Sequence, residues 1–252
     1  MNYKLGKKPA KRDSRNLQLK AVLKELPPVP AEWDFDVAGG SIIPLPVFAN
    51  DKWGDCVMAA RAHQTLRFED FEQKAVIPIS DNEVLKEYWK EQGANCRHRR
   101  PDNGLVVLDS LKCWRSKGWK AAGKSYSIYA FTEVSYLNHD EVMAAIYLLS
   151  GACIGLQLPI SAELQFDAGQ RWDVTTGPDA EPGSLGGHCV YLVGYDGSGP
   201  VGVTWGKKQP MTWSFLDRYC DELYAIVDNQ DKFLRNSPVD VGKLAGYLAQ
   251  LN

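Results

Sequence analysis

The sequence predicts an α+β fold in which a helical first half packs against a strand-rich, antiparallel second half, with a site in the cleft between them. Apolar residues recur at helical spacing up to about residue 149, whereas short β-rich runs separated by Gly, Pro and Asp fill the stretch after Cys153. The 252 residues are 44% hydrophobic and 24% charged, so a large core can form. Ligand sites are common where two unlike halves meet.

Four helices are expected, three in the first half and one just after it. The first begins at Cys56 and continues to about residue 75. Ser80 and Glu83 form the capping-box pattern that opens a second helix. A third helix follows Asn103-Gly104 and ends at Lys117-Gly118, where glycine favours termination. Residues 141–149 predict a fourth.

The strands expected in the second half are short and bounded by turn residues. They cover residues 153–158, 190–195, 201–205 and 223–227. We therefore expect a helical subdomain at about residues 50–125 and a β-rich subdomain at about residues 150–230, within one domain at residues 30–235. Residues 236–252 are expected to form a C-terminal tail.

Residues 1–29 form a basic N-terminal arm that leads into a proline-rich connector. Termini of this composition are usually solvated tails that pack loosely on the body of a protein. Two alternatives are a propeptide-like cover over the site and a docking arm for an acidic partner. Of the three, we expect the solvated tail.

Charge and composition narrow the classes of partner. The net charge of −2 provides no general attraction for nucleic acid, and no apolar run approaches a membrane span. The N-terminus is basic but has no apolar signal-peptide region, so we expect a cytoplasmic or particle-associated protein. The six cysteines are scattered without metal-ligand spacing, which predicts mostly reduced, buried thiols and no metal site.

Two residues have the pattern of a nucleophile and its base. Cys56 follows Gly54-Asp55 and begins a helix, where unpaired backbone N–H groups favour a thiolate. Asp55 would oppose that effect by charge, or would cap the helix with its side chain. His188 stands at the start of a strand far downstream and can activate such a thiol.

The chain resembles the papain-like cysteine peptidase superfamily over about residues 30–228. The resemblance consists of short motifs in a common order and spacing. They are Trp33-Asp34, the run from Ile43 to Val47, Asn50 to Cys56, Asn103-Gly104, His188 to Tyr195 and Val203-Thr204-Trp205-Gly206. This resemblance implies a thiol hydrolase that cleaves a peptide or amide bond through a thioester and needs no metal or organic cofactor.

The resemblance also implies roles for individual residues. His188 would deprotonate Cys56 and return the proton to the leaving amine, while Asn50 and the Cys56 backbone N–H would face the oxyanion. Trp205 would shield the histidine. Residues expected to contact substrate are Gly54, Asn103, Gly104 and Trp205.

One departure from the family pattern leaves a second function class open. Val203 stands where the family has the asparagine that orients the histidine, and valine accepts no hydrogen bond. Thr204 is a replacement through its hydroxyl, and Asp196, in a turn, is a weaker one. The alternative function is a catalytically impaired papain-fold scaffold that acts as a structural or virion-associated binding protein.

Overall fold

The computed structural model describes residues 3–23, 28–93, 101–229 and 239–250. Cys96 and most of the arginine-rich loop around it lie outside these residues. The helices are α1 (Leu19–Val22), α2 (Phe35–Gly39), α3 (Cys56–Gln73), α4 (Asp81–Glu91), α5 (Val107–Lys117), α6 (His139–Leu148), α7 (Ile160–Asp167), α8 (Trp213–Tyr219) and α10 (Val241–Gln250).

The strands form one large antiparallel sheet and a separate hairpin. They are β1 (Trp33–Asp34), β2 (Trp119–Ala121), β3 (Lys124–Tyr126), β4 (Ile128–Glu133), β5 (Ala152–Leu158), β6 (Gly186–Asp196), β7 (Gly199–Thr204), β8 (Lys207–Pro210) and β9 (Cys220–Asp228). The sheet order is β4-β9-β5-β6-β7-β8, β1 also pairs with β6, and β2 and β3 form the hairpin.

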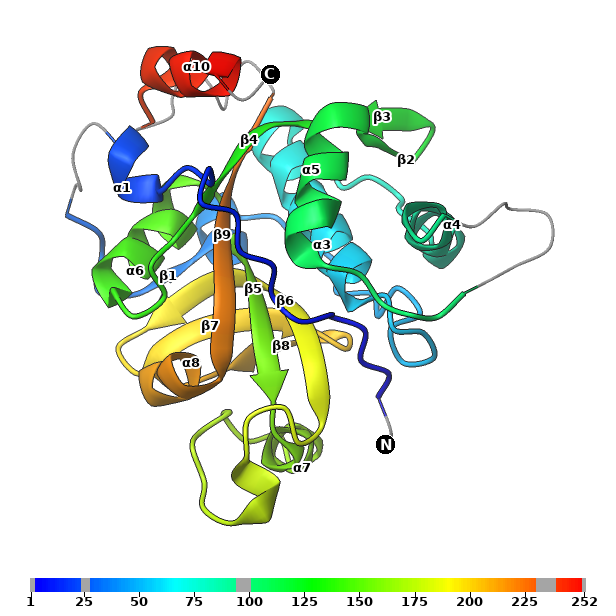
Figure 1. Ribbon diagram of the computed structural model, residues 1–252, viewed down its shortest axis with the longest axis vertical. Helices are drawn as coiled ribbons and strands as arrows, with labels where there is room; N and C mark the ends of the chain where they lie inside the picture. Colours follow the sequence, from blue (N-terminus) through cyan, green and yellow to red (C-terminus); the bar gives the residue numbers. More distant parts are fainter. Residues whose placement is uncertain (1–2, 24–27, 94–100, 230–238, 251–252) are drawn as a thin grey trace.

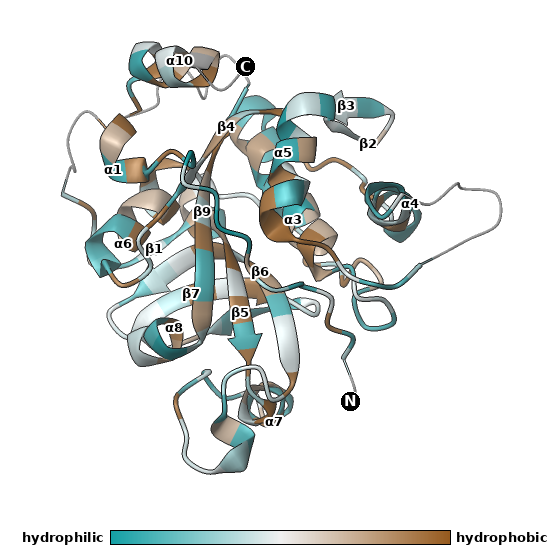
Figure 2. Cartoon of the chain, in the orientation of Figure 1, coloured by the Kyte–Doolittle hydropathy of each residue, from teal (hydrophilic) through white to brown (hydrophobic). Residues whose placement is uncertain are grey.

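The helices α3, α4 and α5 lie together on one side of the molecule and the sheet lies on the other (Figure 1). Helix α3 packs against both α4 and β6. It is buried from Cys56 to Asp70, and its apolar N-terminal turns face the apolar strands at the centre of the molecule (Figure 2). The α+β prediction is therefore confirmed.

Burial of α3 brings two arginines into the core, and both have acidic partners. Arg61 pairs with Glu91 and Arg67 with Asp36, each at 2.8 Å. Removing one partner would leave a buried charge unpaired, so these pairs fix α3 against its neighbours.

Local sequence signals agree with several element ends. The Ser80 hydroxyl accepts a hydrogen bond from the Glu83 N–H, and the Glu83 carboxylate accepts one from the Ser80 N–H, which makes the predicted capping box at the start of α4. Gly118 ends α5 with a φ of 65°, a value that glycine adopts without strain.

The sheet extends beyond the strands predicted from sequence. Strand β4 comes before α6 in the chain yet pairs with β9 and forms an edge of the sheet. Its burial alternates along the strand, but its pairing partner lies almost 100 residues downstream, and such a long-range pairing has no local signal.

The C-terminal segment contains a helix that packs on the N-terminal arm. Helix α10 contacts α1, and the Asp240 N–H donates to the Val22 carbonyl at 2.9 Å. None of the described helices is long and apolar enough to span a lipid bilayer.

Candidate active site

Cys56 is the first residue of α3 and is only 1% exposed. Burial raises the pKa of its thiol to about 11, and the charge of Asp55 adds to the increase. Hydrogen bonds from the backbone of Cys189 and Gly6 act in the opposite direction. The expectation of a thiolate is therefore wrong for the closed site, because loss of solvent outweighs the helix terminus.

Asp55 occupies the N-cap position, but its side chain does not cap the helix. Its Oδ1 accepts a hydrogen bond from Asn50 Nδ2 at 3.1 Å. Burial raises the pKa of this carboxyl to about 8. The expected side-chain cap is therefore wrong, since the carboxyl turns inward to the asparagine.

His188 lies on β6 and has no exposed surface. Its Nε2 is 2.8 Å from the Thr204 hydroxyl on β7, and its ring stacks on Trp205 with centroids 4.5 Å apart and planes at 20°. Its Nδ1 is buried and has no hydrogen-bond partner among the described residues. Burial lowers the pKa of His188 to about 3, so the ring is neutral at ordinary pH.

Neither Val203, at the position of the family's asparagine, nor Asp196, the weaker candidate, forms a hydrogen bond with the imidazole in the described part of the chain. Val203 is buried in β7 opposite Tyr191. Asp196 pairs with Arg171 at 2.7 Å and accepts hydrogen bonds from the backbone at the following turn. Of the candidates named from sequence, Thr204 is the one that contacts the imidazole.

The thiol and the imidazole come from different lobes, and the thiol lies against the backbone of β6 one residue after the histidine. The Cys189 backbone that bonds to the Cys56 thiol belongs to the residue directly after His188. The packing of α3 on β6 therefore brings together two residues that are 132 positions apart in the sequence.

Asn50 lies in the turn before α3, and its side-chain amide already has acceptors. Its Nδ2 is 3.0 Å from the Trp53 carbonyl, in addition to its bond with Asp55. The Lys4 carbonyl lies 3.5 Å away, at the limit of a hydrogen bond. A carbonyl of the N-terminal arm thus approaches the amide that was expected to face an oxyanion.

Residues 3–8 of the arm cross the site between the two lobes, where the N-terminal chain is drawn in dark blue (Figure 1). Tyr3 stacks on Trp205, with ring centroids 4.2 Å apart. The Lys7 N–H donates to the Gly187 carbonyl at 3.0 Å, and the Leu105 N–H donates to the Gly6 carbonyl at 2.8 Å. The loosely packed tail is therefore wrong for this segment, which bridges the lobes and covers the thiol.

Glycines on both walls let the arm approach closely. A Cβ at Gly104 would overlap the Gly6 carbonyl, and one at Gly187 would overlap the Lys7 carbonyl. A Cβ at Gly6 would itself overlap the Gly54 carbonyl. Gly54 and Gly104 thus lie against the arm, their contact with substrate stays a prediction, and the close approaches at Gly6 and Gly187 were missed.

Asn103 lies next to Gly104 in the chain, but no hydrogen bond joins its backbone to the described residues of the arm. It is exposed, and its N–H donates to Gln92 at 2.8 Å.

Lys7 was also missed, because a lysine in a basic terminal segment has no local signal of burial.

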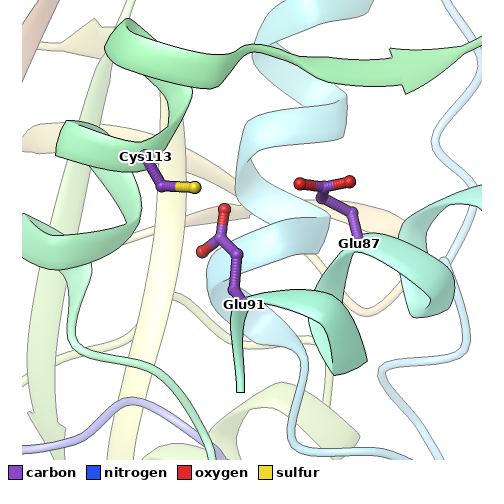
Figure 3. Close-up of side chains that lie close together, drawn as sticks. All are labelled: Glu87, Glu91 and Cys113. Carbon is purple, nitrogen blue, oxygen red and sulfur yellow. The ribbon is translucent and has the colours of Figure 1, made fainter. Parts of the chain in front are cut away.

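A group of possible metal ligands lies on α4 and α5, where Glu87, Glu91 and Cys113 point toward one another (Figure 3). Arg61 pairs with Glu91 at 2.8 Å, and Lys90 pairs with Glu87 at 2.8 Å. These cations already balance both carboxylates, so the group needs no metal ion to be stable.

A helical lobe and an antiparallel sheet lobe that meet at a cysteine and a histidine define the papain-like fold, and the chain has this fold. Xylellain, a cysteine protease from Xylella fastidiosa, is similar with a TM-score of 0.68 at 17% identity, over 91% of this chain and 97% of that one. Procathepsin B S9 from Trypanosoma congolense gives 0.61 at 11% identity, over 90% and 87%.

The Carica candamarcensis cysteine protease CMS1MS2, solved in complex with E-64, gives a TM-score of 0.56 at 13% identity, over 80% of this chain and 100% of that one. No protein-family model matches the chain. No curated protein sequence matches it either. The similarity is thus one of fold at very low sequence identity.

Proposed function

We propose that this chain is a papain-like thiol hydrolase that cleaves a peptide or amide bond through Cys56 and His188, and that its arm keeps it latent. The observation that supports the proposal is the position of the Cys56 thiol against the β6 backbone next to His188. The thiol lies against the residue after His188, while Thr204 engages the far nitrogen of the imidazole. Its Nδ1 has no other partner among the described residues and is available to the thiol.

The reaction follows from these positions once the arm has left. His188 takes the proton of Cys56, and the thiolate attacks the substrate carbonyl to form a tetrahedral oxyanion. Collapse of this intermediate expels the amine, which takes the proton from the imidazole, and leaves a thioester. Water assisted by the same histidine then releases the acid.

The oxyanion would face the backbone N–H of Cys56 and the Nδ2 of Asn50, in the region that the Lys4 carbonyl now approaches. Donors placed in this way supply about 3 kcal/mol of transition-state stabilisation each in enzymes of this kind. Asn50 Nδ2 now donates to Trp53 and Asp55, so the amide would have to exchange one of these two hydrogen bonds for one to the oxyanion.

Latency follows from the burial of both reacting groups. In the closed cleft the pKa of the thiol is raised to about 11 and that of the imidazole is lowered to about 3, so neither forms the ion pair. Departure of the arm would return water to the site. The pKa of the thiol would then fall and that of the imidazole would rise, which favours the thiolate–imidazolium pair. Some neighbours in fold are described as proforms, including the ragweed protease Amb a 11.

The test combines thiol labelling with turnover. We would measure alkylation of Cys56 by iodoacetamide against pH, with the other cysteines as internal controls, and hydrolysis of a mixed peptide library. Cys56→Ala should abolish hydrolysis without unfolding the chain. In a variant with an opened arm, His188→Ala should slow labelling near neutral pH.

The scaffold alternative is favoured by one observation, the absence of the orienting asparagine at Val203. It predicts that Cys56 alkylation depends on pH as in an ordinary cysteine, and that no peptide is hydrolysed even when the arm is open. In that case the cleft would remain a peptide-binding groove without chemistry.

A further inference from the structure

The side chain of Lys7 fills a buried acidic pocket next to the proposed active site. Its Nζ is 2.8 Å from Asp221 Oδ2 and 3.2 Å from Glu222 Oε1, both on β9. The side chain of Lys7 is 1% exposed, and that of Glu222 is 4% exposed. A lysine is rarely buried to this extent unless its charge is paired.

The pocket depends on a glycine in β5. Gly155 pairs with Glu222, and a Cβ at Gly155 would overlap Lys7 Cε and lie 2.6 Å from Glu222 Cγ. A larger residue there would close the space between β5 and the two carboxylates. The fold therefore provides room for a long, thin side chain that ends in a cation.

The backbone hydrogen bonds of the arm are of a kind that an extended peptide makes. The Lys7 N–H bonds to the Gly187 carbonyl, and the Gly6 carbonyl accepts from the Leu105 N–H. These bonds carry no information on side chains beyond the glycine that the close approach at Gly6 requires. The side chain in the pocket thus adds a selection that the backbone bonds do not make.

The pocket has unused capacity for a second donor. Asp221 Oδ1 is buried and receives no hydrogen bond from the described residues. A guanidinium group can donate to more than one carboxylate oxygen at once, so arginine fits the same position. An aliphatic or acidic side chain would leave two carboxylates close together without a counter-charge.

We infer that the cleft selects peptide segments by a lysine or arginine side chain that enters the Asp221–Glu222 pocket, and that Lys7 closes the cleft by occupying this pocket. This inference names the substrate class of the site and rests on the proposed function for its catalytic part. Binding by the pocket does not depend on catalysis.

The first experiment uses the full chain and the rate of Cys56 alkylation, which reports opening of the arm. Lys7→Met removes the charge but keeps a chain of similar length, and it should raise the labelling rate at least tenfold. Lys7→Arg should label like wild type. Lys8→Met, which removes the same charge from an exposed side chain, is the matched control. Equal rates in Lys7→Met and wild type would overturn the inference.

The second experiment measures peptide binding to the Cys56→Ala, Lys7→Met chain by fluorescence anisotropy. The probes are a labelled peptide of residues 3–12 and its twin with norleucine in place of Lys7. The lysine peptide should bind at least tenfold more tightly, and Glu222→Gln should remove most of this difference. Glu181→Gln changes an exposed glutamate in the same way and should leave the affinity difference between the two peptides unchanged.

Three outcomes would count against the pocket: equal affinity for the two peptides, no binding of either, or a difference that survives both Glu222→Gln and Asp221→Asn. The Asp221→Asn variant also covers the case in which Glu222→Gln does not fold, which circular dichroism would reveal.

If the chain binds the lysine peptide more tightly as expected but cleaves no library peptide, the proposed hydrolase fails and the pocket stands. If cleavage occurs, the cleaved peptides should carry lysine or arginine at one fixed position from the cut.

Discussion

Single polar residues decide the state of the site. His188 and Asp55 are fully buried and have perturbed pKa values that are displaced in opposite directions, one lowered to about 3 and one raised to about 8. Each has one side-chain hydrogen-bond partner, Thr204 and Asn50 respectively, while His188 Nδ1 and Asp55 Oδ2 are buried without a partner among the described residues. Small substitutions at Thr204 or Asn50 should therefore lower the free energy of unfolding, because each would leave a buried polar group without its partner.

We expect Thr204→Val to lower the free energy of unfolding by about 1–3 kcal/mol, because it leaves the buried Nε2 of His188 without a partner. Thr204→Ser restores the hydroxyl and should recover most of the loss. Chemical denaturation measures both. In an opened chain Thr204→Val should also slow hydrolysis, and an unchanged rate would show that Thr204 does not orient the histidine.

Asp55 makes a prediction about pH. Its raised pKa means that the native state holds a proton which the unfolded state releases at about pH 4. Stability from this group is therefore present at low pH and is lost as the pH rises toward 8, at up to about 1.4 kcal/mol per pH unit. Asp55→Asn, which cannot ionise, should flatten the decline between pH 6.5 and 8. An equally steep decline in the variant would contradict the assignment.

At the scale of elements, the arm is the feature that separates an open from a closed cleft. It is held by backbone bonds to Leu105 and Gly187, by the ring stack of Tyr3 and by the ion pairs of Lys7. The approach at Gly6 is so close that it tolerates no Cβ.

Gly6→Ala should therefore displace the arm and speed alkylation of Cys56 by roughly tenfold or more, since relieving such an overlap in place costs about 1–3 kcal/mol. Gly197→Ala is the control, because a Cβ at that exposed glycine meets nothing within 4 Å. Labelling at the wild-type rate in Gly6→Ala would mean that the arm is not the barrier.

The start of α4 offers a test that is independent of the site. Ser80→Ala removes one half of the capping box and should lower the free energy of unfolding by about 1 kcal/mol. The Cys56 labelling rate should not change, because Ser80 is exposed and its hydrogen bonds are with Glu83 of the same helix. A large change in labelling would instead couple α4 to the arm.

At the scale of the whole molecule, opening of the cleft is linked to protonation. His188 has a pKa of about 3 when covered and is expected to return toward 6.5 when water reaches it, so opening takes up a proton. The closed state is favoured above pH 6.5 and loses that advantage as the pH falls toward 3.

We therefore expect acid to open the arm. Hydrogen exchange at the Lys7, Lys8 and Leu105 amides, corrected for the intrinsic effect of pH, should speed up by as much as tenfold per pH unit below 6.5. His188→Gln should reduce this dependence. Exchange that is independent of pH down to 4 would show that the imidazole stays neutral after opening.

Local sequence patterns alone predicted the α+β class, the start of α4, the end of α5, and the positions of Cys56 and His188 on their elements. These features follow from local periodicity, caps and turn residues, which are written in short stretches of chain. The resemblance to papain-like peptidases rested on the same short stretches, and the fold confirmed it. The division into domains and the catalytic roles stay predictions.

Only the tertiary structure decided the chemical state of the site. That state depends on burial and on long-range pairing: β4 joins the sheet at β9, Thr204 reaches His188 where an asparagine was missing, and Asp55 turns away from its helix. Above all, Lys7 looks like any lysine of a solvated basic tail until the cleft is assembled. Its burial against β9 comes from residues more than 200 positions away, and no local pattern encodes a contact of that range.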